Sequence, residues 1–383
     1  MNTSITRPPH HSARPLGRLA IAVGATLALV GCTLGGSDEE SPDEDATTPE
    51  AAEEDADEDA NDGAADGAAN DVVRVVSHSS FSLFEGHPEL LEAFEEETGY
   101  TVQIHEADAE VGAQLILTAD SPLGDVAFGI DNAFAGRALE AGVFEPYTSP
   151  NLPAGAEDLV IAEELTPIDF GDVCLNVDLA WFEESELAVP TTFDDLVEPD
   201  YENLTVVTNA ASSTPGLAML LATVGHFGTD GWEGYWEDLT ANGLLVADGW
   251  SQAYYEEFTA HGGDYPVVLS YASSPPYILD DDGEPTTAAM LETCFRQVEY
   301  AGVITGAENP EGAQAFIDFL LTIEAQEAIP ETMFVFPVAE EAELPAEWAE
   351  HAEIAPAPHE VDYAEIEENR ENWIDSWMEI VIG

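Results

Sequence analysis

The sequence predicts an α/β fold in which two domains are joined by extended segments. Short β-branched runs alternate with amphipathic helical stretches, which is the pattern of a parallel sheet covered by helices. The chain has 383 residues, enough for two ordinary domains. Two long extended segments, residues 165–177 and 294–303, are suited to carry the chain from one domain to the other and back.

The N-terminus resembles the signal peptide of a bacterial lipoprotein. Arg14 and Arg18 form a positive region, residues 19–30 form an apolar region too short to span a membrane, and the motif LVGC ends at Cys32. Cleavage after residue 31 leaves Cys32 as a lipidated N-terminus; an ordinary signal peptide with a chance cysteine is the alternative. We therefore expect a protein held by lipid on the outer face of the cytoplasmic membrane, periplasmic or at the cell surface.

Residues 32–71 are expected to form a disordered acidic tether. After the cysteine, the segment consists mainly of Asp, Glu, Ala, Gly and Ser and has no aromatic residue. Such a composition cannot bury enough apolar surface to fold.

The charge balance excludes some classes of partner. Lys and Arg number 7 against 79 Asp and Glu, which gives a formal net charge of −72. Nothing is available to neutralise a phosphate backbone, so nucleic acid is excluded as a main partner, and adhesion to anionic lipid is disfavoured. A surface adapted to high salt is expected, because counterions screen the self-repulsion.

Cys174 and Cys294 are the cysteines that remain beside Cys32. Outside the cytoplasm two thiols more often pair than act separately, so we expect a disulfide, with two buried thiols as the alternative. No CxxC or HxxxH spacing accompanies them, so a metal site is not predicted.

The first part of the chain predicts the βαβ opening of a parallel sheet. Asp131 and Asn132 follow the carboxyl end of a strand and precede a helix, so both helix capping and ligand binding are open interpretations. The expected elements are strand 72–77, a polar turn at His78, helix 87–98, strand 100–105, helix 111–118, strand 125–130 and helix 133–141.

The middle of the chain contains a helix start of a kind that binds polar atoms. Ser213 or Thr214 is a natural N-cap and Pro215 a natural first residue, which leaves free N–H groups beside the hydroxyls of this loop. The other elements expected here are helix 179–185, segment 192–196, strand 204–208, helix 231–241 and strand 244–247.

Residues 249–277 concentrate aromatic side chains in loops and at the ends of elements. Trp250 is expected in a loop, Tyr254 and Tyr255 on a short helix, Tyr271 at the end of strand 266–271, and Tyr277 at the end of a Ser/Pro-rich turn. Rings placed at the ends of rigid elements suit a flat small molecule, including a cationic one. Core packing is the alternative for any single ring.

The C-terminal part predicts helices 310–322 and 324–329, a strand-like segment 333–338 and a final helix 363–380. Trp373, Trp377 and Ile380 recur at helical spacing on that last helix. We expect them to pack rather than to contact ligand.

From residue 72 onward the chain resembles the thiamine-binding proteins of bacterial ABC importers, within the bilobed solute-binding superfamily. The combination of STPGL, GWSxAY and LSYxxSPxY is specific. The segments that carry the resemblance are FGIDN (128–132), PIDFG (167–171), SSTPGL (212–217), GWSQAY (249–254), LSYASSPPY (269–277), IPETMFVFPV (329–338) and RENWIDSW (370–377).

The resemblance implies a periplasmic-binding-protein-like fold of type II, with two α/β lobes joined by crossing strands and ligand in the cleft. Lobe 1 is then expected at residues 72–170 and 298–383, and lobe 2 at residues 171–297. Hinge motion is expected to close the lobes on the ligand.

The resemblance also implies the site. Trp250, Tyr271 and Tyr277 match aromatic residues of the thiamine site, while Asp131 and the two serines match polar contacts. Phe334 stands where the family often has Trp, His78 where Tyr is common and Glu85 where another Trp occurs, so the ligand stays open among thiamine, thiamine monophosphate, thiamine diphosphate and breakdown pyrimidines. The predicted ligand-binding residues are Trp250, Tyr271, Tyr277, Asp131, Asn132, Ser212, Ser213, Phe334 and His78.

The chemistry of these residues agrees with that ligand. Thiamine carries a permanent thiazolium charge and an aminopyrimidine, so aromatic rings can sandwich it with cation–π contacts worth about 0.5–2 kcal/mol each. A carboxylate such as Asp131 can accept from the exocyclic amine or balance the charge. We expect a monomer that delivers its ligand, chemically unchanged, to an ABC permease and its ATPase, without a cofactor.

Three other functions are alternatives to thiamine binding. A ferric-iron-binding protein of the same superfamily is suggested by Tyr254-Tyr255, with His78 or Asp131 as further ligands. A polyamine-binding protein would also use acids and aromatics. A secreted lipoprotein enzyme is the alternative of another class, but no GxSxG, HExxH or paired-carboxylate motif is present, so no catalytic residue is predicted.

Overall fold

One mixed sheet runs through the described part of the chain. The computed structural model describes residues 71–78, 80–107 and 111–383, so the predicted signal peptide, Cys32 and the acidic tether to residue 70 lie outside the described residues. The strands are β1 (Val72–Ser77), β2 (Thr101–Glu106), β3 (Val126–Asp131), β4 (Phe144–Glu145), β5 (Thr166–Asp178), β6 (Thr205–Thr208), β7 (Leu245–Ala247), β8 (Val267–Tyr271), β9 (Thr287–Ala289), β10 (Phe295–Ile304) and β11 (Phe336–Pro337).

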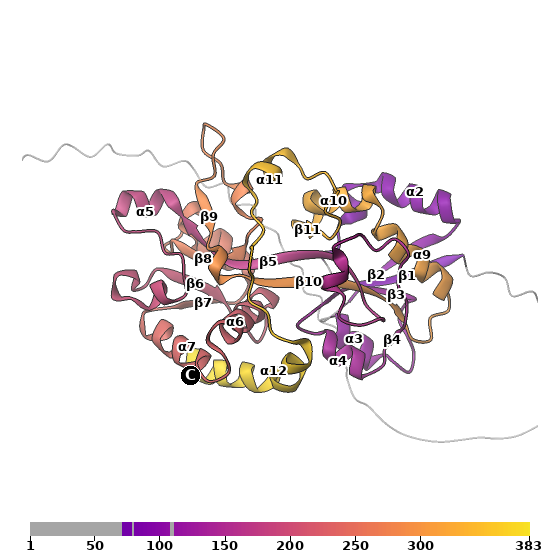
Figure 1. Ribbon diagram of the computed structural model, residues 1–383, viewed down its shortest axis with the longest axis horizontal. Helices are drawn as coiled ribbons and strands as arrows, with labels where there is room; N and C mark the ends of the chain where they lie inside the picture. Colours follow the sequence, from indigo (N-terminus) through magenta and orange to yellow (C-terminus); the bar gives the residue numbers. More distant parts are fainter. Residues whose placement is uncertain (1–70, 79, 108–110) are drawn as a thin grey trace, which may run out of the picture. The chain divides into compact units, whose positions relative to one another are not determined.

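The strand order explains how the two halves are joined. The sheet runs β2-β1-β3-β10-β5-β8-β6-β7, with β4 on β10 and with β9 and β11 on β5. β1 pairs in parallel with β2 and β3, which confirms the predicted βαβ opening. β10 and β5 are antiparallel neighbours in the middle of the sheet and correspond to the predicted crossing segments (Figure 1).

Helices cover the sheet in each half. α9 packs on β1, β3 and β10, whereas α6 packs on β5, β8 and β10. The helices are α1 (Leu83–Gly86), α2 (Pro88–Thr98), α3 (Val111–Leu117), α4 (Ala135–Glu140), α5 (Leu179–Ser185), α6 (Thr214–Phe227), α7 (Trp232–Ala241), α8 (Trp250–Gln252), α9 (Pro310–Leu320), α10 (Ile323–Met333), α11 (Ala346–His351) and α12 (Tyr363–Trp377).

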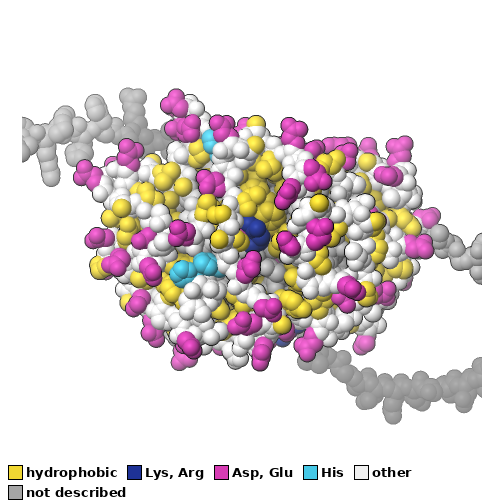
Figure 2. Space-filling model, in the orientation of Figure 1, with side chains coloured by type: hydrophobic (Ala, Val, Ile, Leu, Met, Phe, Trp, Pro, Cys, Tyr) yellow, Lys and Arg dark blue, Asp and Glu magenta, His cyan; other side chains and the backbone are white. Residues whose placement is uncertain are grey.

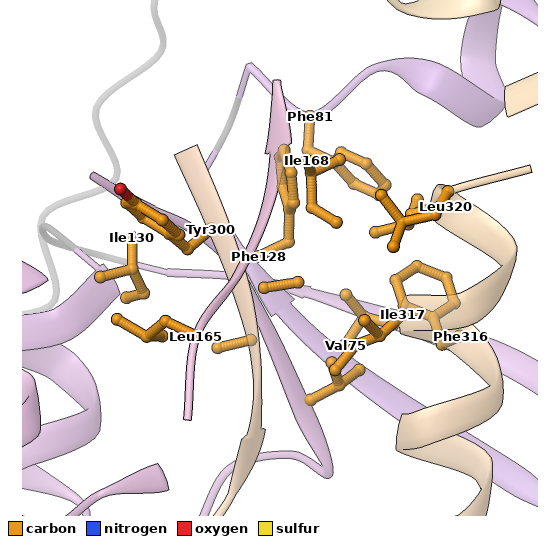
Figure 3. Packing of buried hydrophobic residues seen from close by; sticks show 14 of the residues in the cluster. Val75, Phe81, Phe128, Ile130, Leu165, Ile168, Tyr300, Phe316, Ile317 and Leu320 are labelled. Carbon is orange, nitrogen blue, oxygen red and sulfur yellow. The ribbon is translucent and has the colours of Figure 1, made fainter. Parts of the chain in front are cut away.

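The first hydrophobic core lies between the β1, β3 and β10 strands and α9. Phe316 and Ile317 of α9 meet Val75 and Phe128 of the sheet, and all four are fully buried. Figure 3 shows these side chains together with Tyr300, whose hydroxyl donates to the Leu159 carbonyl at 2.9 Å. The aromatic pairs of this core add about 0.5–1.5 kcal/mol each beyond their area.

The second core is built around α6, α7 and the last helix. Trp236 of α7 and Trp377 of α12 are buried, with ring centroids 5.6 Å apart at 84°, and Trp373 belongs to the same cluster. The predicted packing role of the two C-terminal tryptophans is confirmed. α12 contacts both α4 and α7, and its buried hydrophobic residues belong to the second core. The sequence had placed all of residues 298–383 in lobe 1.

One predicted strand is partly helical. Residues 333–338 were expected to be extended, but α10 continues to Met333 and only Phe336–Pro337 forms a strand. The helix ends because Phe334 adopts a left-handed conformation, with φ of 63°.

The crossing strands are tied together in two ways. A disulfide joins Cys174 in β5 to Cys294, the residue before β10, which is the pairing predicted from the sequence. Arg296 of β10 makes a two-pronged ion pair with buried Asp172 of β5, with Nε–Oδ1 at 2.8 Å and Nη2–Oδ2 at 2.9 Å. The Ala355 amide also donates to Asp172 Oδ2, at 2.7 Å.

The charge imbalance is visible on the surface. Figure 2 shows carboxylates spread over the whole of the visible face, with hydrophobic patches between them. None of the helices in the described part of the chain combines the length and the hydropathy that a membrane span requires.

Candidate ligand-binding site

A cavity of about 930 Å³ collects most of the predicted site residues. Its volume lies at the upper end of the range of small-molecule sites, about 300–1,000 Å³. The cavity is lined from both halves of the sheet. His78 directly follows β1 and Asp131 ends β3, and Trp250 and Tyr271 come from α8 and β8. The predicted residues in its wall are His78, Asp131, Ser212, Ser213, Trp250, Tyr271, Tyr277 and Phe334.

Asn132 is the predicted site residue that does not line the cavity. Its Nδ2 donates to the Arg296 carbonyl at 2.9 Å, and its Oδ1 accepts from the Val298 amide at 3.2 Å. Both ends of the amide are therefore occupied by the backbone of β10. The side chain therefore joins β10 to the segment between β3 and α4.

One wall of the cavity is an aromatic stack on α8 and the turn after it. Trp250 begins α8 instead of lying in a loop, and its ring stacks on Tyr254 with centroids 4.8 Å apart at 15°. Trp250 Nε1 donates to Ser270 Oγ at 3.0 Å, and Ser270 Oγ lies 2.8 Å from Ser274 Oγ. The indole is therefore held in place by its polar atom, which leaves ring surface for a ligand.

The adjacent tyrosines of this wall differ in their surroundings. Tyr254 is 4% exposed and Tyr255 is 55% exposed, with ring planes 86° apart. Burial raises the pKa of Tyr254 to about 12, which disfavours the tyrosinate that a ferric site would need at neutral pH.

A second aromatic group also lines the cavity. Tyr277 and Phe334 pack edge to face with centroids 5.4 Å apart. Trp348 of α11 supports the pair, because its Nε1 donates to Tyr277 Oη at 2.9 Å. Ser273 Oγ donates to the Phe334 carbonyl at 2.9 Å, which joins this pair to the end of β8.

Tyr271 lies at the carboxyl end of β8, opposite Val173 of β5. Gly171 leaves the space for its ring: a Cβ at position 171 would lie 3.1 Å from Tyr271 Cδ1. Burial, together with the charges of Glu299 and Asp131, raises the pKa of the Tyr271 hydroxyl well above its usual value.

The start of α6 brings hydroxyls into the cavity. Ser213 is the N-cap residue, as expected, but its hydroxyl donates to Thr208 Oγ1 at 2.9 Å instead of capping the helix. Pro215 occupies the first turn, and both Ser212 and Thr214 line the cavity. The amide groups of this first turn are available to polar or anionic atoms.

The floor of the cavity is acidic. Asp131 at the end of β3 accepts from the amides of Ala133 and Phe134 through Oδ1, at 2.9 and 3.1 Å, so this oxygen holds the turn before α4, whose N-cap residue is Phe134. Its Oδ2 accepts from Gln297 Nε2 at 3.3 Å. The residue also lines the cavity, so one carboxylate serves both the backbone and the cleft.

Glu299 is a cavity residue that sequence reasoning missed. It lines the cavity beside His78, with His78 Nε2 3.2 Å from Glu299 Oε1. In the sheet it is registered opposite both Asp131 of β3 and Asp169 of β5. No local motif marks it, because its place depends on pairing between strands that are distant in sequence.

Arg370 of α12 contributes a cationic side chain to the lining residues. Its guanidinium carbon lies 4.1 Å from the centroid of the Phe134 ring. Among the residues that the structure describes, no group of three or more His, Cys, Asp or Glu side chains is arranged to hold a metal ion.

Comparison with known proteins places the chain in a family. Residues 121–369 match the bacterial extracellular solute-binding proteins, so the chain belongs to this family, whose members bind solutes for ABC transporters and are not enzymes. It is 29% identical over 322 residues to the thiamine-binding periplasmic protein of Brucella suis, covering 80% of this chain and 91% of that one.

Solved structures agree with the fold. A periplasmic thiamin binding protein superposes with a TM-score of 0.68 at 26% identity, covering 81% of this chain and 96% of its own. The apo ferric ion-binding protein A of Pasteurella haemolytica superposes with a TM-score of 0.64 at 17% identity, covering 82% and 98%. The predicted α/β fold of the periplasmic-binding-protein type is thereby confirmed.

Proposed function

We propose that this solute-binding protein binds thiamine or one of its phosphates in the cavity described above and presents it to an ABC permease. The observation that carries the proposal is the meeting of two features in one cavity. Aromatic rings, among them Trp250 and Tyr277, form its walls, and the carboxylates of Asp131 and Glu299 form its floor.

Each half of thiamine has a partner in this arrangement. The thiazolium is a permanent cation, and rings together with carboxylates stabilise a cation in a partly desolvated site. The aminopyrimidine is flat and can stack on an indole or phenol. Hydroxyls and amides at the start of α6 suit the hydroxyethyl arm or a phosphate attached to it.

The relatives support the same ligand. The Brucella suis protein is named for thiamine binding and spans nearly the whole described part of this chain. Ferric iron is less well supported, because the tyrosines at 254 and 255 differ so strongly in burial and orientation.

Closure is part of the proposal. The two lobes expected from the sequence would move about the crossing strands β5 and β10, and a ligand touching both walls would favour the closed form through its higher affinity for it.

Calorimetric titration in high salt tests the ligand. Thiamine, thiamine monophosphate and thiamine diphosphate are compared with spermidine and ferric citrate. The proposal expects saturable one-to-one binding of at least one thiamine compound, recovered unchanged, and none of iron. Tight binding of spermidine or ferric citrate without thiamine binding contradicts it.

Lipid anchoring through Cys32 is also a proposal. The variant Cys32→Ser removes the thiol that would be acylated. We expect the wild-type protein in the membrane fraction of its host and the variant in the soluble or secreted fraction; identical fractionation of both rules the anchor out.

A further inference from the structure

Three carboxyl groups lie side by side beneath the cavity. Glu299 of β10 is registered opposite Asp131 of β3 on one side and opposite Asp169 of β5 on the other. Directly opposed residues of neighbouring strands present their side chains on the same face of a sheet. Three acids in adjacent strands cannot all carry a full charge at low cost.

Asp169 is the neutral member of this row. It is fully buried, and within the described residues no hydrogen-bond donor reaches either of its carboxyl oxygens. Burial and the neighbouring charge of Glu299 hold the pKa of Asp169 well above its usual value. A protonated Asp169 can donate to Glu299, which leaves the negative charge on Glu299.

Glu299 already has a partner with basic character. His78 Nε2 lies 3.2 Å from Glu299 Oε1, and the Glu299 side chain is 14% exposed. Although burial alone would raise it, the pKa of Glu299 is lowered by the neighbouring imidazole of His78 and by the neighbouring carboxyl of Asp169. The charge of Glu299 is therefore stabilised from two sides.

The position of His78 is enforced by the backbone. Its Nδ1 accepts from the Ser80 amide at 3.2 Å, which leaves the proton of the neutral ring on Nε2, toward Glu299; uptake of a second proton at Nδ1 gives up this hydrogen bond. Gly129 adopts φ of 89°, and a Cβ at this position would collide with the His78 ring. The histidine thus lies between β3 and the cavity in a fixed orientation.

The charged groups that act on the pKa of His78 are acidic, although the cavity it lines also holds the guanidinium of Arg370. The acidic groups are Glu299 of β10 and Asp131 of β3, with Asp169 of β5 behind Glu299. Burial alone would lower the pKa of His78, but the charges of Glu299 and Asp131 outweigh it, so the pKa is raised above 6.5.

We propose that Glu299 is the counter-ion of a cationic ligand and that His78 competes with the ligand for it, so that cation binding expels a proton from His78. This inference rests on the proposed function, because it requires a ligand with a positive charge. In the empty protein, protonated His78 balances the charge of Glu299. When the cationic ligand binds, His78 loses its proton and the ligand balances that charge instead.

The sign of the pH dependence follows. Below the pKa of His78 in the empty protein the imidazolium is present and repels a second cation beside Glu299. Above that pKa the ring is neutral and the full carboxylate charge is available. The affinity for a cation is therefore expected to rise with pH. Where each binding event releases one full proton from His78, the affinity should rise by up to about tenfold per pH unit.

Isothermal titration of thiamine at about pH 6 and about pH 8, in buffers of different ionisation enthalpy, tests the proposal. The wild-type protein is expected to bind about tenfold more tightly at the higher pH and to release close to one proton per ligand at the lower pH. In His78→Gln, which keeps a polar side chain but cannot be charged, both effects should vanish.

The controls separate the two claims. His87 pairs with Glu89 at 3.0 Å but does not line the cavity, so His87→Gln should behave as the wild type. Thiamine binding with equal affinity at both pH values and no proton release overturns the competition while leaving the proposed function intact, and so does a pH dependence retained in His78→Gln. Absence of thiamine binding at both pH values overturns the proposed function and this inference together.

Discussion

Trp250 and Tyr277 offer ring surface to a ligand because their polar atoms are already engaged within the protein. Trp250 Nε1 donates to Ser270 Oγ, and Tyr277 Oη accepts from Trp348 Nε1. Each bond fixes the orientation of a ring in the cavity wall. The rings are therefore preorganised, which reduces the entropy lost on binding.

Truncation of either ring should weaken binding with little effect on the fold. We expect Trp250→Ala and Tyr277→Ala each to reduce the affinity for thiamine by about 1–3 kcal/mol in calorimetric titration. Tyr277→Phe keeps the ring but loses the bond from Trp348 Nε1, so it should bind more weakly than the wild type and more tightly than Tyr277→Ala. Tyr363→Ala, outside the cavity, is the control; unchanged affinity in both alanine variants contradicts the site assignment.

Phe334 combines a ring that lines the cavity with an unfavourable backbone conformation. Its φ of 63° is a conformation that costs a non-glycine residue about 1 kcal/mol or more. We expect Phe334→Gly to melt no lower than the wild type and yet to bind thiamine more weakly, since the strain and the ring are removed together. A large fall in melting temperature argues against this trade-off.

At the scale of elements, the acid row across β3, β10 and β5 links stability to pH. Because the folded pKa of Asp169 is raised, its contribution to stability is present below its unfolded pKa and is lost as pH rises through the folded value. Asp169→Asn should therefore stabilise the protein at neutral pH, by about 1 kcal/mol or more, and flatten the rise in stability toward acid. Urea denaturation at several pH values measures both; a less stable variant at neutral pH contradicts the assignment.

The pairing of β5 with β10 depends on Arg296. Removing it leaves buried Asp172 with the Ala355 amide as a donor but without its cation. Since the Arg296 side chain is 22% exposed, we expect Arg296→Met to lower the free energy of unfolding by about 2–4 kcal/mol, less than for a fully buried pair. The double variant Arg296→Met with Asp172→Asn should recover part of that loss in the same denaturation measurement.

Local patterns were sufficient to predict most elements. Alternating β-branched runs gave β1, β2 and β3, and Pro215 after Ser213 marked the start of α6. The end of α10 was missed, because the apolar residues 333–338 fit a strand, and only the tertiary placement of Phe334 makes the chain turn there.

The candidate site could be predicted where its residues lie in one stretch of sequence. It could not be predicted where strand pairing brings distant residues together. Trp250, Tyr271 and Tyr277 belong to one sequence stretch with a family pattern. Glu299 could not be found in this way, because it enters the cavity through its alignment with Asp131 and Asp169. The bonds of Asn132 to the β10 backbone could not be predicted for the same reason, because Arg296 and Val298 are far away in sequence.

At the scale of the whole molecule, the charge of −72 should make stability depend on salt. Like charges on an acidic surface repel one another, and ions screen that repulsion within about 3 Å at 1 M. We expect the melting temperature to rise between about 0.1 M and 2 M KCl by 10 °C or more, in differential scanning calorimetry. A flat or falling profile contradicts the interpretation of the surface as adapted to salt.

A crystal structure of the complex with thiamine is the decisive measurement for the proposed site. We predict one unmodified thiamine in the cavity, stacked against Trp250 or Tyr277, with its thiazolium nearest to the carboxylates of Asp131 and Glu299. Thiamine bound elsewhere, or a metal held by Tyr254 and Tyr255 in its place, would show that the proposed site is wrong.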